Sequence, residues 1–242
     1  MQIEGRNPVL ETLRAKNKID RLVINSGSIN DPKIQEIIKL GKHAQIKIQF
    51  KSRKFIDKIA DTAVNQGVIA FRGTKSEDFL NFAGLLAQIA DRKQTPFLIY
   101  IREVLNEYNV GSIMRTAEAT GANGIILPPK ISLTSQMVRA SMGGSEYLPV
   151  INFSLFEAIK EAHDNAINVV GIEVTGDKYY YEADLTGPML LIIGGEDRSL
   201  STPITEKCDA VVKIPLKGKI NSLNMSIAAS IVMYEKVRQE GV

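Results

Sequence analysis

The sequence predicts an α/β protein made of a small αβ unit followed by a larger unit on a parallel sheet. In the larger unit, short apolar runs alternate with longer stretches of helical periodicity, which is typical of parallel strands joined by right-handed helical crossovers. The small unit repeats this alternation with fewer elements. At 242 residues and 44% hydrophobic composition, the chain is long and apolar enough to bury a sizeable core.

The small unit is predicted to alternate helices and strands. Asn7, with Pro8 after it, is expected to cap a first helix that ends near residue 15, and Asp31 with Pro32 begins a second helix that ends near residue 42. A third helix is expected over residues 52–63. Apolar runs predict strands over residues 19–25, 46–50 and 67–71.

A helix over residues 76–93 is predicted to link the two units, because its apolar residues recur at helical spacing. The larger unit covers residues 94–242. A Gly-x-Gly-x-x-Gly loop does not follow its first strand, so an ordinary Rossmann cofactor site is disfavoured. The strands of this unit are predicted over residues 96–101, 124–127, 148–151, 168–173, 189–193 and 210–214.

The two units differ in charge. Residues 1–75 contain 15 Lys and Arg against 7 Asp and Glu, a net charge of +8, whereas residues 76–242 contain 15 against 20, a net charge of −5. This asymmetry indicates a basic module for a polyanion joined to a more acidic module. The densest basic patches, at residues 39–47 and 51–54, suit phosphate contacts. A Lys-rich solvated surface without a partner is the alternative.

Cysteine content and hydropathy exclude several classes of protein. The single cysteine, Cys208, excludes an internal disulfide and a cysteine-rich metal site, and we expect it to pack as a small buried hydrophobe. No apolar run approaches the roughly 18 residues of a membrane span. The N-terminus also lacks the apolar segment of a signal peptide. We therefore expect a cytoplasmic protein that binds neither a membrane nor a metal.

Three predicted strands end in polar clusters. Because the carboxyl ends of parallel strands meet at one edge of a sheet, side chains that follow them can form a common site. Capped helices and ordinary hydrogen-bonded loops are the alternative explanation for each cluster. The clusters contain Asn109 and Arg115 after the first strand, Gly194, Gly195 and Glu196 after the fifth, and Ser222 and Asn224 after the sixth.

Taken jointly and in this order, the three clusters resemble the motifs of the SpoU (TrmH-like) branch of the SPOUT RNA 2′-O-methyltransferases. The third motif is the most specific. The residues that match are Asn109, Gly111, Arg115 and Ala117 in the first motif, Gly194 to Glu196 in the second, and Ile214, Pro215, Ser222, Leu223 and Asn224 in the third.

The N-terminal unit adds to the resemblance. Residues 4–11 and 65–70 look like parts of the substrate-binding domain that precedes the catalytic domain in family members acting on 23S ribosomal RNA. Two positions depart from the family pattern: Ser199 stands where the second motif usually has Gly, and Glu107-Tyr108 stands where the first usually has Asp-Pro. A Ser at a position that favours positive φ would change the geometry of that loop.

The resemblance implies a fold, a cofactor and a set of site residues. Residues from about 190 to 230 would form a deep trefoil knot that holds S-adenosyl-L-methionine. The implied catalytic residues are Asn109, Arg115, Glu196, Ser222 and Asn224, and the implied cofactor-binding residues are Gly194, Gly195, Ile214, Leu216 and Leu223.

The chemistry that the resemblance implies is methylation of a ribose 2′-hydroxyl. The family proposal makes Arg115 the group that activates this hydroxyl. A guanidinium is essentially always protonated, so Arg115 can instead hold the phosphate and ribose by forked hydrogen bonds. His43 and His163 lie outside all three motifs and are not placed to act as a base.

The leading functional hypothesis is a methyltransferase that acts on ribosomal RNA, with a guanosine of 23S rRNA as its target. Transfer RNA is the alternative substrate, and a non-catalytic RNA-binding or ribosome-assembly protein is the alternative class. SpoU-like enzymes are homodimers, in which Asn109 and Arg115 would approach the partner's site. The apolar residues expected at the dimer contact lie on a helix over residues 224–237: Ile227, Ile231, Val232 and Tyr234. This apolar face could equally be covered within one subunit.

Overall fold

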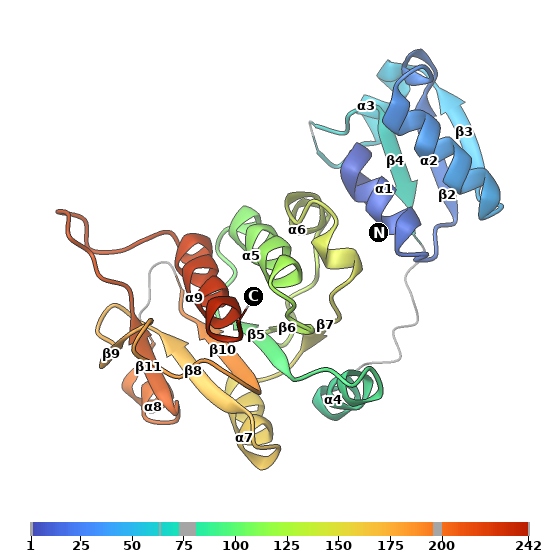
Figure 1. Ribbon diagram of the computed structural model, residues 1–242. Helices are drawn as coiled ribbons and strands as arrows, with labels where there is room; N and C mark the ends of the chain where they lie inside the picture. Colours follow the sequence, from blue (N-terminus) through green and yellow to red (C-terminus); the bar gives the residue numbers. More distant parts are fainter. Residues whose placement is uncertain (1, 63, 73–80, 196–199, 242) are drawn as a thin grey trace.

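The computed structural model describes residues 2–62, 64–72, 81–195 and 200–241, which fold around two β-sheets (Figure 1). The first sheet has the order β1-β4-β2-β3. Strands β2 and β3 are parallel, and β4 pairs antiparallel with both β1 and β2. Strand β1 was not predicted from the sequence. The bounds are Gln2–Glu4 for β1, Arg21–Asn25 for β2, Lys47–Lys51 for β3 and Val68–Phe71 for β4.

The helices that flank this sheet are α1 (Arg6–Arg14), α2 (Pro32–His43) and α3 (Arg53–Ile59). The predicted start of α2 is confirmed, because the Asp31 carboxylate accepts the backbone N–H groups of Lys33 and Ile34. The short helix η1 (Ser26–Ser28) follows β2.

Two predicted helix ends in this unit were wrong. Helix α1 begins at Arg6 rather than Pro8, with Gly5 as its N-cap, and the Asn7 side chain accepts a hydrogen bond from Lys33 Nζ at 2.6 Å. Helix α3 ends at Ile59 rather than near residue 63. The next backbone N–H groups, of Asp61 and Thr62, donate to the fully buried Glu4 carboxylate at 2.6 and 3.0 Å, so they are not available to continue the helix.

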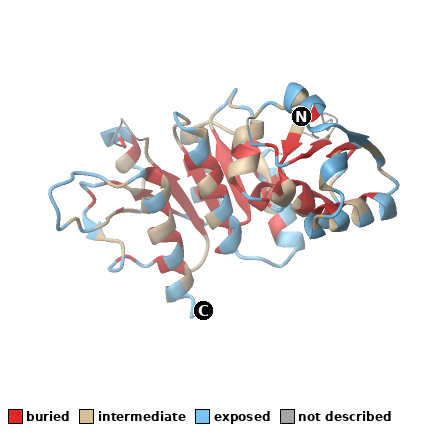
Figure 2. Cartoon of the chain, turned by 90° about the horizontal axis from the view of Figure 1, so that it is seen from above, coloured by how far each residue is buried: buried red, intermediate tan, exposed pale blue. Residues whose placement is uncertain are grey.

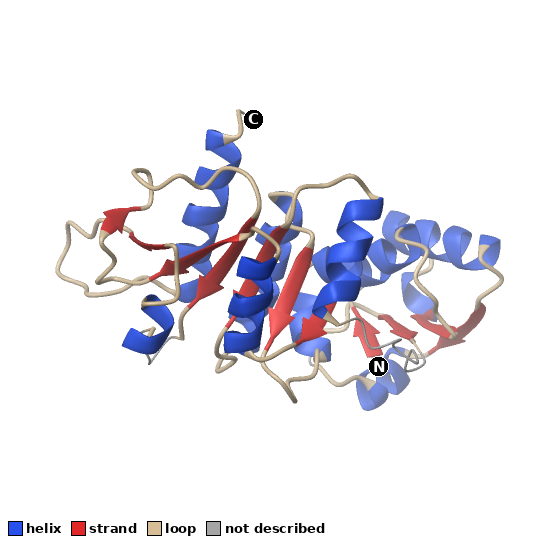
Figure 3. Cartoon of the chain, turned by 90° about the horizontal axis from the view of Figure 1, so that it is seen from below, coloured by secondary structure: helices blue, strands red, loops and turns tan. Residues whose placement is uncertain are grey.

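The second sheet is parallel in every strand pair, as predicted, with the order β7-β6-β5-β10-β8-β11-β9 (Figure 3). Strand β9 was not predicted and forms an edge of the sheet, where Tyr179 and Tyr181 stack with ring centroids 5.4 Å apart. The bounds are Phe97–Ile101 for β5, Gly124–Leu127 for β6, Val150–Asn152 for β7, Asn168–Ile172 for β8, Lys178–Tyr179 for β9, Met189–Ile193 for β10 and Ala210–Lys213 for β11.

Helices cover both faces of the second sheet, and the buried residues lie along the sheet and the inner faces of the helices (Figure 2). Helices α5, α6 and α9 enclose one apolar core, and α4, α7 and α8 enclose the other. The bounds are Phe82–Asp91 for α4, Glu107–Ala119 for α5, Ser135–Ala140 for α6, Gly144–Glu146 for the short helix η2, Leu155–Asp164 for α7, Thr202–Thr205 for α8 and Met225–Gln239 for α9.

Helix α4 occupies the later part of the predicted linker helix, and residues 73–80 lie outside the described part of the chain. Val232 was predicted to lie at a dimer contact or to be covered within one subunit, and it is fully buried within this chain. Its side chain belongs to the apolar core that α9 shares with α5, because it lies on the face of α9 that turns toward the sheet. The deep trefoil knot stays a prediction that rests on the family resemblance.

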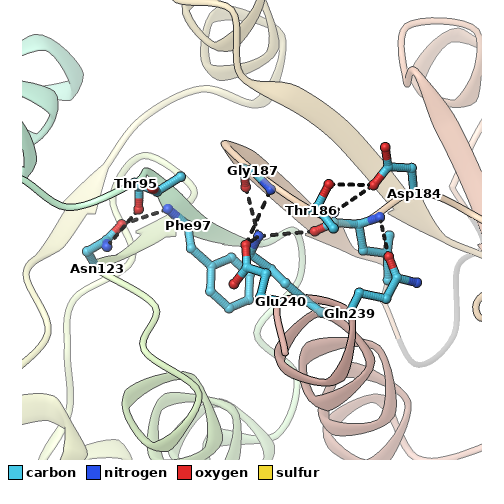
Figure 4. Close-up of polar contacts among 10 residues, drawn as sticks. Thr95, Phe97, Asn123, Asp184, Thr186, Gly187, Gln239 and Glu240 are labelled. Carbon is cyan, nitrogen blue, oxygen red and sulfur yellow. Dashed lines mark hydrogen bonds and ion pairs between the residues drawn. The ribbon is translucent and has the colours of Figure 1, made fainter. Parts of the chain in front are cut away.

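Polar contacts fix the end of α9 that is remote from the predicted site (Figure 4). Lys236 is 2% exposed, and its ammonium donates to the backbone carbonyls of Leu185 and Gly187 at 3.0 and 2.7 Å. Nearby, Asn123 accepts from the Phe97 N–H at 2.7 Å and donates to the Thr95 carbonyl at 3.1 Å. These contacts stabilise the amino ends of β5 and β10. The predicted site lies at the opposite, carboxyl ends of these strands.

The two units pack against each other through polar and apolar contacts. The Glu146 side chain, 1% exposed, accepts from Asn17 Nδ2 at 2.9 Å and pairs with Arg72 Nη1 at 3.2 Å. Val138 of α6 is fully buried within the apolar core of the N-terminal unit. Residues of the first unit thus pair with a buried carboxylate of the second unit and cover one of its apolar side chains.

Candidate active site

Two asparagines from distant parts of the chain meet at the edge of the second sheet. Asn109 lies in the first turn of α5, and Asn224 is the N-cap of α9. Asn224 Nδ2 donates to Asn109 Oδ1 at 3.0 Å, and Asn224 Oδ1 accepts from the backbone N–H of Ser226 at 2.9 Å. Asn109 is only 7% exposed. This contact joins the first and third predicted motifs.

Close packing of α5 against its neighbours holds this contact in place. Thr116 Oγ1 lies 3.1 Å from Ser230 Oγ of α9, and apolar side chains of both helices share one core. On another face of α5, Gly111 faces α6, where a Cβ would meet the Cβ of Ala140 at 2.4 Å and the carbonyl oxygen of Met137 at 2.6 Å. The glycine of the first motif is therefore needed for helix packing.

The second predicted motif begins directly after β10. Strand β10 pairs with β5, so Gly194 and Gly195 lie beside the residues that follow β5. A Cβ built on Gly195 would meet Glu103 Oε2 at 1.8 Å. The same Glu103 oxygen is buried and has no hydrogen-bond partner among the described residues. The Glu103 carboxylate thus lies at the carboxyl edge of the parallel sheet, beside the glycines of the second motif.

The residues between β11 and α9 lie partly on the surface. Ile214, Leu216 and Leu223 are half-buried, and Ile214 packs against the core beneath α5 and α9. Ser222 is exposed and makes no side-chain hydrogen bond within the described ranges. In Figure 1 this segment runs out beyond the sheet before it returns to α9. Of the third motif, the structure thus places Asn224 in the contact with α5 and leaves Ser222 outside it.

Arg115 does not join the asparagine pair. It follows Asn109 by six residues on α5, which places it about 120° around the helix from Asn109. Its side chain is exposed and makes no hydrogen bond or ion pair within the part of the chain that the structure describes. Arg115 is therefore available to a group from outside this chain. Glu196 and Ser199 lie outside the described residues.

Two residues near the site were not identified from the sequence. Glu103 follows β5 and contacts Gly195, and Asn106 caps α5 by accepting the Tyr108 N–H at 2.9 Å. Both stand in the loop between a strand and a helix, where polar side chains are common in any α/β fold. The position of Glu103 at a strand end was the available signal, and its contact with Gly195 depends on the pairing of β5 with β10.

Models of two known families of protein domains match this chain. The model of the SpoU rRNA Methylase family matches residues 96–234. The chain belongs to the SpoU family. A second model, described as RNA 2′-O ribose methyltransferase substrate binding, matches residues 2–72. The SpoU family uses S-adenosylmethionine, and the protein is an RNA 2′-O-ribose methyltransferase of this family.

Similar proteins cover nearly the whole SpoU chain. YacO of Bacillus subtilis (strain 168), whose name places it in the TrmH family of tRNA/rRNA methyltransferases, is 33% identical over 238 residues, which are 97% of this chain and 94% of YacO. A crystal structure of an RNA 2′-O ribose methyltransferase shares the fold with a TM-score of 0.81 at 22% identity, covering 100% of this chain and 89% of the other. The SpoU methyltransferase AviRb of Streptomyces viridochromogenes, crystallised with AdoMet, has a TM-score of 0.77 at 23% identity, covering 99% and 90%.

Other reactive side chains of this SpoU chain stand apart from the site. His43 and His163 are exposed, and His163 Nε2 lies 3.1 Å from Asp209. Burial raises the pKa of the half-buried Cys208 to about 11, so its thiol is protonated at neutral pH and is not a nucleophile. The described ranges hold no cluster of three or more His, Cys, Asp or Glu residues suited to a metal. None of their helices is both long and apolar enough to cross a bilayer.

Proposed function

We propose that this protein transfers the methyl group of S-adenosyl-L-methionine to a ribose 2′-hydroxyl of ribosomal RNA, with a guanosine of 23S rRNA as its leading target. The hydrogen bond from Asn224 to Asn109 carries the proposal, because it joins two of the three motifs beside the ends of β5 and β10. The substrate-binding match over residues 2–72 favours ribosomal RNA, and transfer RNA is the second candidate.

The residues at the end of β10 fit a cationic cofactor. Gly194 and Gly195 expose backbone groups without side chains, and the buried Glu103 oxygen has no partner within the described residues. When bound, the sulfonium of S-adenosylmethionine supplies an electrophilic methyl group. Gly194, Gly195, Ile214, Leu216 and Leu223 would surround the cofactor, mainly through backbone groups.

The polar residues of the motifs would position the RNA. Asn109 and Asn224 fix each other, which holds one end of α9 against one end of α5 and orients the groups that face the ribose. Ser222 and Glu196 would complete the binding of the ribose and of Arg115. Holding the reacting oxygen and methyl carbon about 3–3.5 Å apart replaces a bimolecular encounter and supplies a large part of the rate.

Arg115 would act on the RNA of the partner subunit's site. Arg115 is exposed and lies about 120° around α5 from Asn109, so a composite site in a homodimer would bring its guanidinium to the ribose and phosphate. An apolar stripe on α9 suits an isologous contact, because Ile227, Ile231 and Tyr234 recur at helical spacing and Ile227 and Tyr234 are each 53% exposed.

Residues 1–75 would form the RNA substrate-binding domain, residues 76–93 the linker and residues 94–242 the catalytic domain. The net charge of +8 in residues 1–75 supports this division. Lys39, Lys47, Lys51 and Lys54 are all exposed and available for phosphate contacts. Such a protein would work in the cytoplasm, where ribosomal RNA is found.

Two measurements test the proposed function. Titration calorimetry of the full chain with S-adenosylmethionine should show saturable heat, and the absence of both heat and thermal stabilisation would favour a non-catalytic RNA-binding protein. Mapping 2′-O-methyl groups in RNA from a deletion strain should then reveal one ribosomal position that loses its methyl group. Loss of a transfer RNA methyl group instead would replace the ribosomal target with the second candidate.

A further inference from the structure

We propose that a hollow between the two units binds one nucleotide of the substrate RNA, with its base against Tyr108; this inference rests on the proposed function. The hollow has a volume of about 210 Å³ and is walled by residues of both units. From the N-terminal unit it takes Asn7, Pro8 and Gln66, and from the second unit Tyr108, Arg139 and Met142. An aromatic ring, apolar side chains and amide groups in one hollow suit a nucleobase, which has a flat face and a polar edge.

Arg139 is the clearest sign that the hollow takes a ligand. Its Nε is buried and has no hydrogen-bond partner among the described residues. Its Nη2 donates to the Tyr108 hydroxyl at 2.8 Å, which holds the ring in place while leaving Tyr108 49% exposed. Arg139 also lines the hollow, so its guanidinium brings a positive charge and N–H donors that suit a base oxygen, a ring nitrogen or a phosphate oxygen.

The amide side chains of the opposite wall are oriented by other contacts. Gln66 Oε1 accepts from the Arg6 backbone N–H at 2.9 Å, and Asn7 Oδ1 accepts from Lys33 Nζ at 2.6 Å. Both amide oxygens are engaged and neither NH₂ group has a partner among the described residues, so both can donate to the polar edge of a base. Residues 4–11 and 65–70, which resemble the family's substrate-binding domain, thus both contribute to this wall.

Two of the seven described non-glycine residues that have positive φ line the hollow. Gly5 has φ 98°, and the non-glycine residues Gln66 and Met142 have φ 50° and 53°. Left-handed conformations at non-glycine residues cost free energy and persist where the surrounding structure enforces them, often at binding sites. Gln66 of the first unit and Met142 of the second unit thus both contribute to the walls of the hollow.

A second hollow beside the first suits the phosphate of the same nucleotide. It has a volume of about 400 Å³, shares Asn7 and Gln66 with the first, and adds Arg6 and Lys33. The Asp31 carboxylate also lines it and pairs with Arg6 Nη1 at 2.5 Å, so Lys33 is the main cation left for a phosphate. Two adjoining hollows, one aromatic and one basic, match the base and the phosphate of a nucleotide.

The first hollow is also placed to serve the reaction. Tyr108 directly precedes Asn109, the residue that bonds to Asn224, and both lie in the first turn of α5. A nucleotide held on Tyr108 would therefore bind at the same end of α5 as the asparagine pair. This position suits a nucleotide that flanks the methylated one or the methylated one itself.

Methyl NMR of the full chain tests the hollow directly. Met142 lines it, so the ¹³C-methyl signal of Met142, assigned with a Met142→Leu variant, reports a bound ligand. Titration with AMP, GMP, CMP and UMP should shift this signal for at least one nucleotide. Tyr108→Ala should weaken the binding by about tenfold through loss of base stacking. Tyr108→Phe, which keeps the ring, should retain most of it.

The control is Phe156→Ala. Phe156 is 50% exposed on α7, nearly the same exposure as Tyr108, and it lies on the other face of the second sheet from α5. It should leave nucleotide binding unchanged. A Met142 signal that none of the four nucleotides moves, or that moves equally in Tyr108→Ala, overturns the proposal. Titration of S-adenosylmethionine into the same sample distinguishes the two hypotheses. Cofactor binding without nucleotide binding would reject only the proposed nucleotide site. The absence of cofactor binding would reject the proposed methyltransferase function.

A competition experiment distinguishes RNA from a free nucleotide. Filter binding of bulk ribosomal RNA to the full chain should weaken in Tyr108→Ala and not in Phe156→Ala. The nucleotide that moves the Met142 signal should also compete with RNA. If the nucleotide binds without competing, and Tyr108→Ala binds RNA normally, the hollow serves a free nucleotide and its assignment to the RNA substrate is wrong.

Discussion

Gly195 lies against the carboxylate of Glu103 so closely that a Cβ on residue 195 would stand 1.8 Å from Glu103 Oε2. The contact brings the end of β10 to the end of β5, which are neighbouring strands of the second sheet. It also leaves a carboxylate oxygen buried and without a partner among the described residues, an arrangement that costs free energy in the free protein. A ligand that donates a hydrogen bond or brings a positive charge to Glu103 would recover this free energy on binding.

Glu103→Gln should therefore separate stability from cofactor binding. Removal of the unpaired negative charge should raise the free energy of unfolding of the free protein by about 1 kcal/mol. The affinity for S-adenosylmethionine should fall more than that for S-adenosylhomocysteine, which lacks the sulfonium charge. Urea unfolding and calorimetry measure the two effects. Glu118→Gln, at an exposed position of α5, is the control and should change neither. Equal losses for both ligands would mean that Glu103 does not face the sulfonium.

Gly111→Ala should destabilise the protein. An added Cβ would meet Ala140 Cβ at 2.4 Å and Met137 O at 2.6 Å, so α5 would be pushed from α6. Overpacking of this kind costs about 1–3 kcal/mol, and the preference of Ala for helices offsets only part of it. Gly218→Ala is the control, because its Cβ would meet nothing within 4 Å. A thermal melt in which both variants match the wild type would show that the two helices can move apart without cost.

Asn224→Ala should lose both a helix cap and the contact with Asn109. Loss of the cap should lower the free energy of unfolding by about 1 kcal/mol. Asn81→Ala removes a comparable cap, since Asn81 accepts the Gly84 N–H at 2.8 Å at the start of α4, away from the site. Asn224→Ala should lose more stability than Asn81→Ala, because it also removes the hydrogen bond to Asn109, and only Asn224→Ala should lose most methyl transfer in a tritiated-methyl assay. If activity falls equally in both, Asn224 acts only as a cap.

The elements that were predicted correctly are those with strong local signals. All residues of β5 and β10 are buried, so their sequences read as uninterrupted apolar runs between turns. Strand β1 was missed because it has three residues and includes Glu4, a carboxylate that reads as exposed. Glu4 is in fact buried because the N–H groups of Asp61 and Thr62 satisfy it. A partner so distant in sequence leaves no local signal.

In the site, too, individual residues could be predicted from local signals, whereas their long-range contacts could not. The rule that strand ends carry function singled out Asn109, Gly195 and Asn224 from the sequence. It did not show that Asn109 bonds to Asn224, or that Gly195 meets Glu103. Both contacts depend on which strands are neighbours, and the strand order β5-β10-β8-β11 does not follow the order of the chain.

RNA binding should depend on lysines of the N-terminal unit. Lys51 and Lys54 are exposed near the start of α3, and each that contacts a phosphate releases counterions when RNA binds. The double variant Lys51→Ala/Lys54→Ala should bind RNA more weakly and reduce the slope of log K against log salt by about 0.7 to 0.9 for each lost contact. Lys207→Ala, an exposed lysine of the second unit, is the control. An unchanged slope in the double variant would remove these lysines from the RNA-binding surface, while its affinity for S-adenosylmethionine should stay at the wild-type value.

A composite site makes a distinct prediction for mixtures of inactive proteins. Asn224 is bonded to Asn109 of its own chain, whereas Arg115 is exposed about 120° around α5 from Asn109. If Arg115 serves the partner's site, a heterodimer of Arg115→Ala and Asn224→Ala protomers carries both lesions in one site and leaves the other intact. Random exchange should therefore restore part of the methyl transfer that each homodimer lacks. Native mass spectrometry verifies the exchange, and a matched mixture of Ile227→Asp variants of both proteins, in which the exposed stripe of α9 is broken, should stay inactive. Verified heterodimers without activity would place Arg115 in the site of its own subunit and would end the composite-site proposal, while the methyltransferase assignment would stand.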